Sequence, residues 1–223
     1  MRSFEEIEAL AAEKKGGPET LNALLAEHNA PRTAEELEKV GDDRWLAMFT
    51  KCVFQAGFSW KVIEAKWAGF EEAFHGFDIA RNAFMDDAAF DSLLSNTAII
   101  RNGAKIQAVR DNAAFLLELR KEGGAGQVLG NWPSEDFCGL LEMLKKRGSR
   151  LGGNSGQMAM RFAGRDGFVL SQDVTARLIA EGVIDKPASS KRAMAAVQAA
   201  FNGWRAETGR SLMEISKVLA FSC

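Results

Sequence analysis

The chain has 223 residues with 28 basic and 30 acidic side chains, which gives a formal net charge of −2. Hydrophobic residues make up 47% and charged residues 26% of the chain, an ordinary globular composition that excludes wholesale disorder. No apolar run approaches the roughly 18 residues that cross a bilayer, and the N-terminal segment lacks the apolar core of a signal peptide. We therefore expect a soluble, cytoplasmic protein with no membrane partner.

Cys52, Cys138 and Cys223 are the three cysteines, and none of them shows the short spacings typical of zinc ligands. We therefore expect neither a disulfide framework nor a metal site, and the sequence indicates no other cofactor.

Charge is distributed unevenly along the chain. Residues 1–120 carry 14 basic and 20 acidic side chains, whereas residues 121–223 carry 14 basic and 10 acidic ones. Within the second part, residues 143–165 contain basic side chains and no acidic one. Such a stripe is able to neutralise phosphates, which indicates a polyanionic partner, although a solvated helix end has the same composition.

Apolar residues recur at helical spacing, and glycine or proline breaks separate the helical segments. In chain order, this pattern predicts helices over residues 4–11, 21–25, 33–40, 45–53, 58–67, 70–77, 86–94, 103–119, 134–147, 156–163, 173–181, 189–206 and 209–219. The run Thr33-Ala34-Glu35-Glu36 is typical of a capping box at a helix start. No segment alternates with period two, so we predict an all-α fold.

A glycine-rich turn lies between the predicted helices 134–147 and 156–163. It reads Leu151-Gly152-Gly153-Asn154-Ser155-Gly156 and follows three basic residues, Lys146, Arg147 and Arg150. Glycines allow a sharp turn that presents backbone N–H groups, and with the start of the next helix these groups offer a seat for a phosphate. An ordinary interhelical turn is the alternative interpretation.

Asp173 stands where an apolar segment, 167–171, leads into the next predicted helix. A carboxylate at this place is either the N-cap of that helix or an acidic group directed at a ligand near the glycine turn. The two interpretations do not exclude each other.

Aromatic residues surround a glycine in the segment Phe54-Gln55-Ala56-Gly57-Phe58-Ser59-Trp60. This arrangement suits a pocket wall or a wedge into a base stack, although aromatic residues at helical spacing are more often core. Further along, Arg101 and Lys105 are four residues apart, a spacing that also suits a merely exposed basic face.

Taken together, these segments resemble the 3-methyladenine DNA glycosylase I family, whose members carry similar QAGLSW and IIRNRxKI segments. The matching residues here are 55–60 and 99–106, with Asn112 and Ala113 downstream. Residues 151–173 are similar to the hairpin and aspartate of the wider helix-hairpin-helix glycosylase superfamily. The resemblance implies a two-lobed helical fold over residues 44–223, preceded by a helical extension over residues 1–43.

The resemblance also implies roles for individual residues. The hairpin residues Gly153, Asn154, Ser155 and Gly156 would hold the DNA backbone together with the basic side chains named above. Asp173 would be catalytic, Gly57 and Phe58 would form a wedge, and Trp60, Cys52, Phe54 and Gln55 would line the base pocket. The resulting expectation is a monofunctional hydrolase that removes a flipped alkylated purine, such as 3-methyladenine, from double-stranded DNA. We expect a monomer associated with the bacterial nucleoid.

This sequence departs from the family in its base pocket and at its terminus. Cys52 stands where the family has a glutamate, the chain contains no tyrosine, and the family's terminal Cys/His zinc site has no counterpart. We expect residues 1–43 to take the place of that zinc site by packing against the C-terminal helices. Two other functions stay open at this point: a non-catalytic binder of damaged DNA, and a helical protein–protein module.

Overall fold

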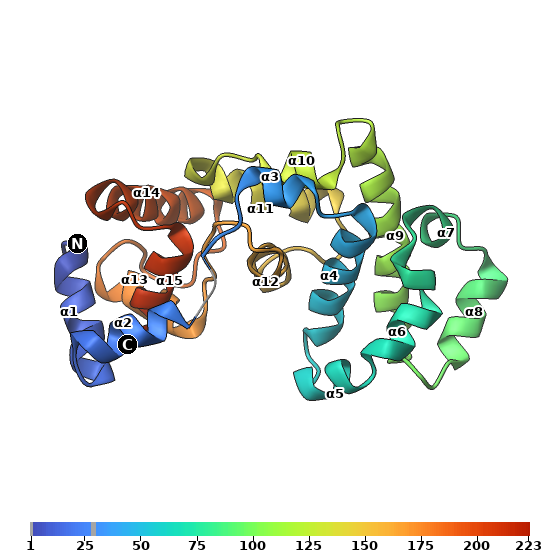
Figure 1. The fold of residues 1–223 in the computed structure, drawn as a ribbon, viewed down its shortest axis with the longest axis horizontal. Helices are drawn as coiled ribbons and strands as arrows, with labels where there is room; N and C mark the ends of the chain where they lie inside the picture. The colour runs from blue at the N-terminus through green and yellow to red at the C-terminus, as the bar shows by residue number, and fades with distance from the viewer. Residues whose placement is uncertain (1, 28–29) are drawn as a thin grey trace. The chain divides into compact units, whose positions relative to one another are not determined.

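The computed structural model describes residues 2–27 and 30–223, so that Met1, His28 and Asn29 lie outside the described part. The described residues form α-helices and short 3-10 helices and contain no β-strand, which confirms the all-α prediction (Figure 1). The elements are α1 Phe4–Lys15, α2 Pro18–Ala26, α3 Ala34–Glu38, α4 Asp42–Gln55, α5 Trp60–Ala65, α6 Trp67–Ala73, η1 His75–Phe77, α7 Ile79–Ala83, α8 Asp87–Ser95, α9 Gly103–Arg120, α10 Ala125–Gly130, η2 Ser134–Asp136, α11 Phe137–Arg147, α12 Asn154–Ala163, α13 Gln172–Ala180, α14 Lys191–Thr208 and α15 Leu212–Phe221.

Helix starts follow from local capping chemistry. The predicted capping box at Thr33 is present, because its side chain accepts a hydrogen bond from the Glu36 N–H while the Glu36 side chain accepts one from the Thr33 N–H. Ser3 and Ser211 begin α1 and α15 in the same way. No helix in the described ranges is long and apolar enough to cross a membrane.

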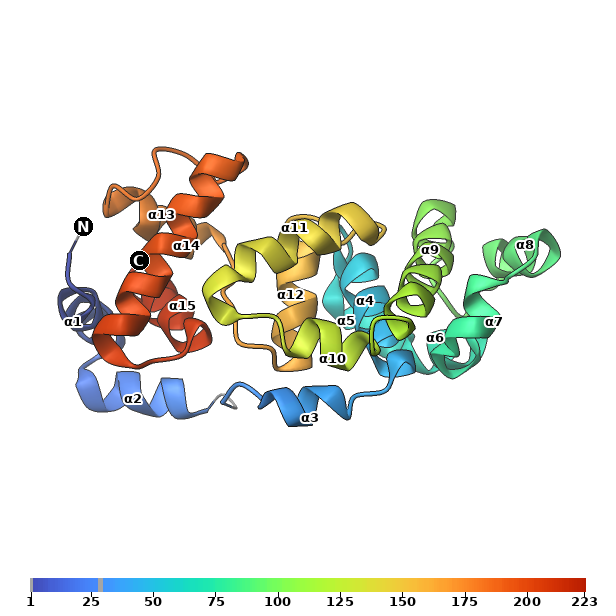
Figure 2. The ribbon, with the colours of Figure 1, turned by 90° about the horizontal axis from the view of Figure 1, so that it is seen from above.

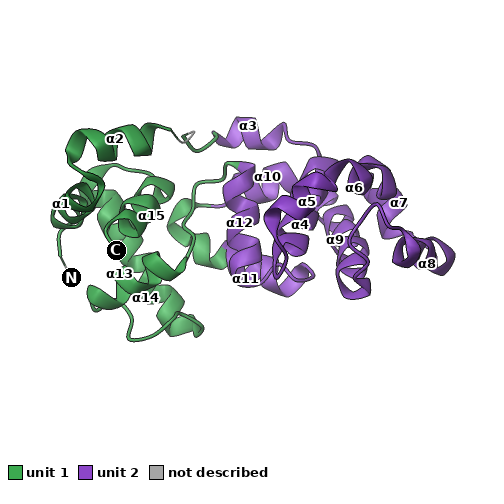
Figure 3. Cartoon of the chain, turned by 90° about the horizontal axis from the view of Figure 1, so that it is seen from below, with its two compact units in different colours: residues 1–32, 133–139, 164–223 green, residues 33–132, 140–163 purple. Residues whose placement is uncertain are grey.

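The chain divides into two compact units, each built from segments that are not contiguous in sequence (Figure 3). Unit 1 comprises residues 1–32, 133–139 and 164–223, and unit 2 comprises residues 33–132 and 140–163. The residues expected to form one N-terminal extension, 1–43, are therefore shared between the two units.

Unit 2 is built around α4, which packs against α9 and α12 (Figure 1). The buried side of α4 includes Trp45 and Phe49, and the Phe49 ring lies 6.5 Å from the Phe115 ring of α9. A further set of stacked aromatic rings joins α6 to η1, with centroids 5.4–6.2 Å apart; its members are Trp67, Phe70, Phe74 and Phe77. These contacts hold α4 and α6 in place, and the segment 56–60 follows directly after α4.

Unit 1 collects α1, α2 and α13–α15, and α1 packs against α15 and α14 (Figure 2). Phe4 is fully buried against Trp204, with ring centroids 6.4 Å apart. Arg2 forms an ion pair of 2.7 Å with Glu181, a buried carboxylate. The expectation that the N-terminal segment packs against the C-terminal helices is thus confirmed for α1, whereas α3 packs against α10 in unit 2.

Candidate functional site

The glycine-rich turn forms a hairpin between α11 and α12, and its glycines are needed for different reasons. Gly153 has a φ of 58°, in the left-handed region that favours glycine. A Cβ atom at Gly156 would lie 2.3 Å from the Leu151 carbonyl oxygen, so only glycine allows this close approach. Gly153 and Asn154 are exposed and Ser155 is half-buried, so the backbone at the start of α12 is open to solvent.

Asn112 of α9 holds the hairpin in place. Its side-chain amide donates to the Ser149 carbonyl oxygen over 3.0 Å, and its amide oxygen accepts from the Ser149 N–H over 2.7 Å. Asn112 is buried, so these two bonds satisfy groups that water does not reach. Arg150 adds a third link, because its Nε donates to the Ala104 carbonyl oxygen over 3.2 Å. These three hydrogen bonds therefore hold the hairpin in a fixed position against α9.

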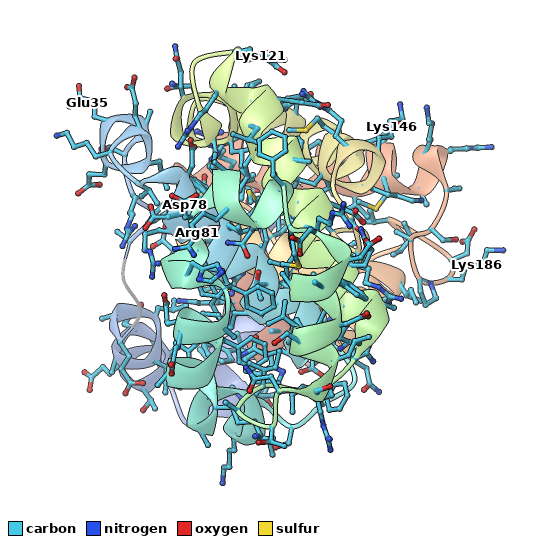
Figure 4. All side chains as sticks on the ribbon, turned by 90° about the vertical axis from the view of Figure 1, so that its right-hand side faces the viewer. Glu35, Asp78, Arg81, Lys121, Lys146 and Lys186 are labelled. Carbon is cyan, nitrogen blue, oxygen red and sulfur yellow. The ribbon has the colours of Figure 1, made fainter. Side chains whose placement is uncertain are left out.

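The predicted basic stripe beside the hairpin is partly neutralised by acidic neighbours. Arg147 forms ion pairs of 2.6 Å with Glu122 and 3.5 Å with Glu118, and the bond to Arg147 lowers the pKa of Glu122. Lys146 pairs with Glu142 over 3.0 Å but stays at the surface, where it is labelled in Figure 4. Arg150 and Arg101 are exposed.

Lys105 lies in the interior and not on a surface that faces solvent. The residue is 6% exposed, and its Nζ donates to the carbonyl oxygens of Phe54, over 3.2 Å, and of Ala56. Burial lowers the pKa of Lys105, and the charge of Arg150 lowers it further. The prediction that Lys105 contacts a DNA phosphate does not fit this placement, because its ammonium group already completes the end of α4.

The segment after α4 presents aromatic side chains to solvent. Gly57 has a φ of 78°, which turns the chain away from the end of α4. Phe58 and Trp60 are 39% and 50% exposed, and the Lys105 ammonium lies 4.5 Å from the centre of the Phe58 ring. The Trp60 indole meets the ring of Phe162, from α12, at 5.9 Å and an interplanar angle of 74°. Trp60 is therefore a half-exposed platform beside the hairpin helix.

The other residues predicted for the base pocket are buried at the end of α4. Cys52 is 3% exposed, and burial raises the pKa of its thiol to about 12, so it carries no charge near neutrality. Phe54 is fully buried edge-on to Phe70, with centroids 4.7 Å apart. Gln55 is 5% exposed, and its Oε1 accepts no hydrogen bond within the described part of the chain.

Asp173 belongs to unit 1, whereas the hairpin and Trp60 belong to unit 2. Ser171 is the N-cap of α13, since its side chain accepts from the Val174 N–H over 3.2 Å. The interpretation of Asp173 as the N-cap is therefore wrong. Asp173 is an exposed residue in the first turn of α13, and its carbonyl oxygen accepts from the Cys223 thiol over 3.0 Å.

Sequence reasoning assigned no site role to Phe162 and no hairpin contact to Asn112. Phe162 lies within the predicted helix 156–163, and no local pattern places it against Trp60. In residues 2–27 and 30–223, no three His, Cys, Asp or Glu side chains are grouped so that they could hold a metal ion.

Residues 37–130 match the model of the methyladenine glycosylase family. The DNA-3-methyladenine glycosylase of Haemophilus influenzae is 38% identical over 69 residues, which are 31% of this chain and 37% of that protein. DNA-3-methyladenine glycosylase 1 of Escherichia coli is 35% identical over 69 residues, again 37% of its length. The match thus spans little more than a third of these curated relatives.

Solved structures are similar to a larger part of the chain. A crystal structure of 3-methyladenine DNA glycosylase I is 27% identical with a TM-score of 0.50, over 60% of this chain and 81% of that one. The 8-oxoguanine glycosylase/lyase of Methanocaldococcus jannaschii, in complex with DNA, has a TM-score of 0.55 over 97% of this chain and 96% of that one. Its identity is 13%, so that it is evidence of fold alone. Residues 37–130 are thus similar to the methyladenine glycosylase family, and the fold of the chain is similar to that of the solved 8-oxoguanine glycosylase/lyase structure.

Proposed function

We propose that the protein is a DNA glycosylase that hydrolyses the N-glycosidic bond of a flipped alkylated purine, such as 3-methyladenine, in duplex DNA. The proposal rests on the arrangement in unit 2. Helix α12 begins at the exposed hairpin backbone and contacts the exposed Trp60 through Phe162. Further support comes from the family match and from the relatives named DNA-3-methyladenine glycosylase.

The hairpin is the proposed contact with the DNA backbone. Residues 153–156 offer backbone N–H groups at the start of α12, where the helix dipole also favours an anion. Arg150, Lys146 and Arg101 are exposed cations that would add a salt-dependent attraction to phosphates. Arg147 is a weaker candidate, because it is held by Glu122 and Glu118.

The segment 57–60 is the proposed contact with the base and the base stack. A base within duplex DNA is out of reach, so the nucleotide has to leave the helix, at a cost of a few kcal/mol. Phe58 would fill the gap in the stack, and Trp60 would stack on the extruded base. Lys105 would act as a positioning residue, since it ties Ala56, next to Gly57 and Phe58, to α9.

Bond cleavage requires stabilisation of a positively charged sugar. An alkylated purine is a good leaving group, and its departure leaves an oxocarbenium-like sugar, as in glycoside hydrolysis. We assign Asp173 the role of stabilising this cation and orienting the attacking water. Residues 148–156 of the hairpin contain no lysine, so the proposed enzyme has no lyase nucleophile there and releases the base by hydrolysis.

Release of free base from methylated duplex DNA tests the proposal. The protein is incubated with duplex DNA that contains 3-methyladenine, and the released base is separated from the DNA and quantified. Unmodified duplex of the same sequence is the control. We expect release of 3-methyladenine and the appearance of abasic sites. Salt-sensitive binding without release would contradict the proposal and would identify a non-catalytic binder of damaged DNA.

A further inference from the structure

Phe162 lies on the side of α12 that a soluble helix normally keeps polar. The buried side of this helix consists of Gly156, Gln157, Ala159, Met160 and Ala163. Phe162 is 40% exposed, and Met158, one turn earlier on the same side, is half-buried. An apolar side chain of this size on the outer face of an amphipathic helix is typical of a contact surface.

The contact with Trp60 defines the shape of this surface. The two rings meet at 74° with their centroids 5.9 Å apart, the edge-to-face arrangement that aromatic pairs prefer. The pair leaves 50% of Trp60 and 40% of Phe162 accessible, so that two flat apolar surfaces meet at nearly a right angle. A planar ring stacked on the indole would therefore have one of its edges against the second aromatic side chain.

Trp60 and Phe162 together form what we call the aromatic corner, and helix α12 connects this corner to the hairpin. Phe162 follows Asn154, the first residue of α12, by eight residues, which corresponds to about 12 Å along a helix axis. A phosphate held at the start of α12 and a base held near its end would thus be kept at a fixed separation by one helix.

We propose that Phe162 is a specificity-determining residue of the base site, an inference that rests on the proposed glycosylase function. It holds the Trp60 indole from one side and presents a ring without hydrogen-bonding groups to the edge of the stacked base. A purine edge that carries a methyl group packs well against this ring. An unmodified edge loses hydrogen bonds to water and gains none, so that it is disfavoured.

The inference is tested with free bases as inhibitors of base release. Inhibition constants of 3-methyladenine and adenine are measured with the full-length protein, together with kcat and KM on methylated duplex DNA. For the unaltered protein we expect 3-methyladenine to bind more tightly than adenine. Phe162→Ala is expected to reduce this preference at least tenfold, within the range typical of an apolar contact in a binding pocket.

Phe162→Tyr is the sharper variant, because it keeps the ring and adds a hydroxyl group that can hydrogen-bond an unmodified edge. We expect it to tighten adenine binding relative to 3-methyladenine while the melting temperature stays unchanged. Phe84→Ala is the matched control, since Phe84 is an 80% exposed phenylalanine elsewhere in the same unit. An unchanged preference in both Phe162 variants of an active enzyme would overturn the inference and leave the proposed function intact. Absence of base release by the unaltered protein would overturn both.

Discussion

Lys105 shows how a single buried cation connects two parts of the proposed site. Its ammonium group donates to two carbonyl oxygens at the end of α4 and lies over the Phe58 ring. The last carbonyl groups of a helix have no partners within the helix, so a lysine here completes α4 as well as fixing the segment after it. We therefore expect Lys105 to be needed first for the stability of the fold and only then for the function of the site.

Replacement of Lys105 by methionine is expected to destabilise unit 2. The Phe54 and Ala56 carbonyl oxygens would each lose a donor, and at the buried Phe54 carbonyl group the missing partner costs about 1–3 kcal/mol. Urea unfolding measures the loss of stability. Lys121→Met, at an exposed lysine, is the control and should change the free energy of unfolding by less than about 0.5 kcal/mol. Equal stability of the two variants would show that the Lys105 bonds contribute nothing.

The thiols of buried Cys52 and half-buried Cys138 predict a fall in stability at alkaline pH. Burial raises the pKa of both Cys52 and Cys138 to about 12 from the ordinary value of 9.0. Between these values the unfolded chain releases thiol protons that the folded chain retains, so the free energy of unfolding decreases as pH rises through 9. From pH 8 to pH 10 the expected decrease is about 1.4 kcal/mol for each thiol.

Urea unfolding at pH 8 and pH 10 checks this prediction. The chain contains no tyrosine, which removes one other group that would titrate in this range. Cys52→Val, which cannot ionise, should lose about half of the pH dependence. A Cys52→Val variant with the same pH dependence as the unaltered protein would show that Cys52 is not the source.

At the scale of residues, the sequence predicted types of side chain better than their surroundings. The motif around Lys105 is visible in the sequence, but its burial depends on a contact with Phe54 that is 51 residues distant. Asp173 was a reasonable N-cap because aspartate is a preferred capping residue, yet Ser171, two residues earlier, takes that position. Local preference does not decide between two neighbouring residues that are both good caps.

At the scale of elements, the hairpin between α11 and α12 depends on the packing of one glycine. Gly156→Ala would place a Cβ atom 2.3 Å from the Leu151 carbonyl oxygen, so that the turn has to open. We expect a loss of about 1–3 kcal/mol in stability, together with weaker binding to duplex DNA. Fluorescence anisotropy with a labelled duplex and urea unfolding measure the two effects.

Gly203→Ala provides the matched control for the hairpin variant. Gly203 lies within α14, has no atom within 4 Å of the added Cβ position, and is helical, so alanine should stabilise the protein by up to about 1 kcal/mol. Tight DNA binding by Gly156→Ala would contradict the role that we assign to the hairpin.

Most helix positions could be predicted closely from the sequence, because apolar spacing and capping residues are local signals, but the short helices α7 and α10 were not predicted. The predicted helices 45–53 and 103–119 correspond to α4 and α9. The pairing of helices is not local, so the attachment of the hairpin to α9 through Asn112 and the contact between α12 and Trp60 appear only in three dimensions.

At the scale of the whole molecule, the residues to which we assign roles are distributed over the two compact units. The hairpin, the aromatic corner and the family match at 37–130 belong to unit 2, whereas Asp173 and the helices around α1 belong to unit 1. Each unit is assembled from distant stretches of sequence, which is why composition and periodicity along the chain did not reveal this division. We assign the binding of DNA and base to residues of unit 2, and charge stabilisation to Asp173, a residue of unit 1.

Asp173→Asn tests this account most directly, since it changes the charge of one exposed side chain and almost nothing else. The measurement is the single-turnover rate of 3-methyladenine release from duplex DNA with protein in excess. Asp185→Asn, at another exposed aspartate of unit 1, is the control. We predict that Asp173→Asn slows release at least a hundredfold, while DNA binding and the Asp185→Asn rate stay at the level of the unaltered protein. An unchanged rate of release in Asp173→Asn would contradict the account.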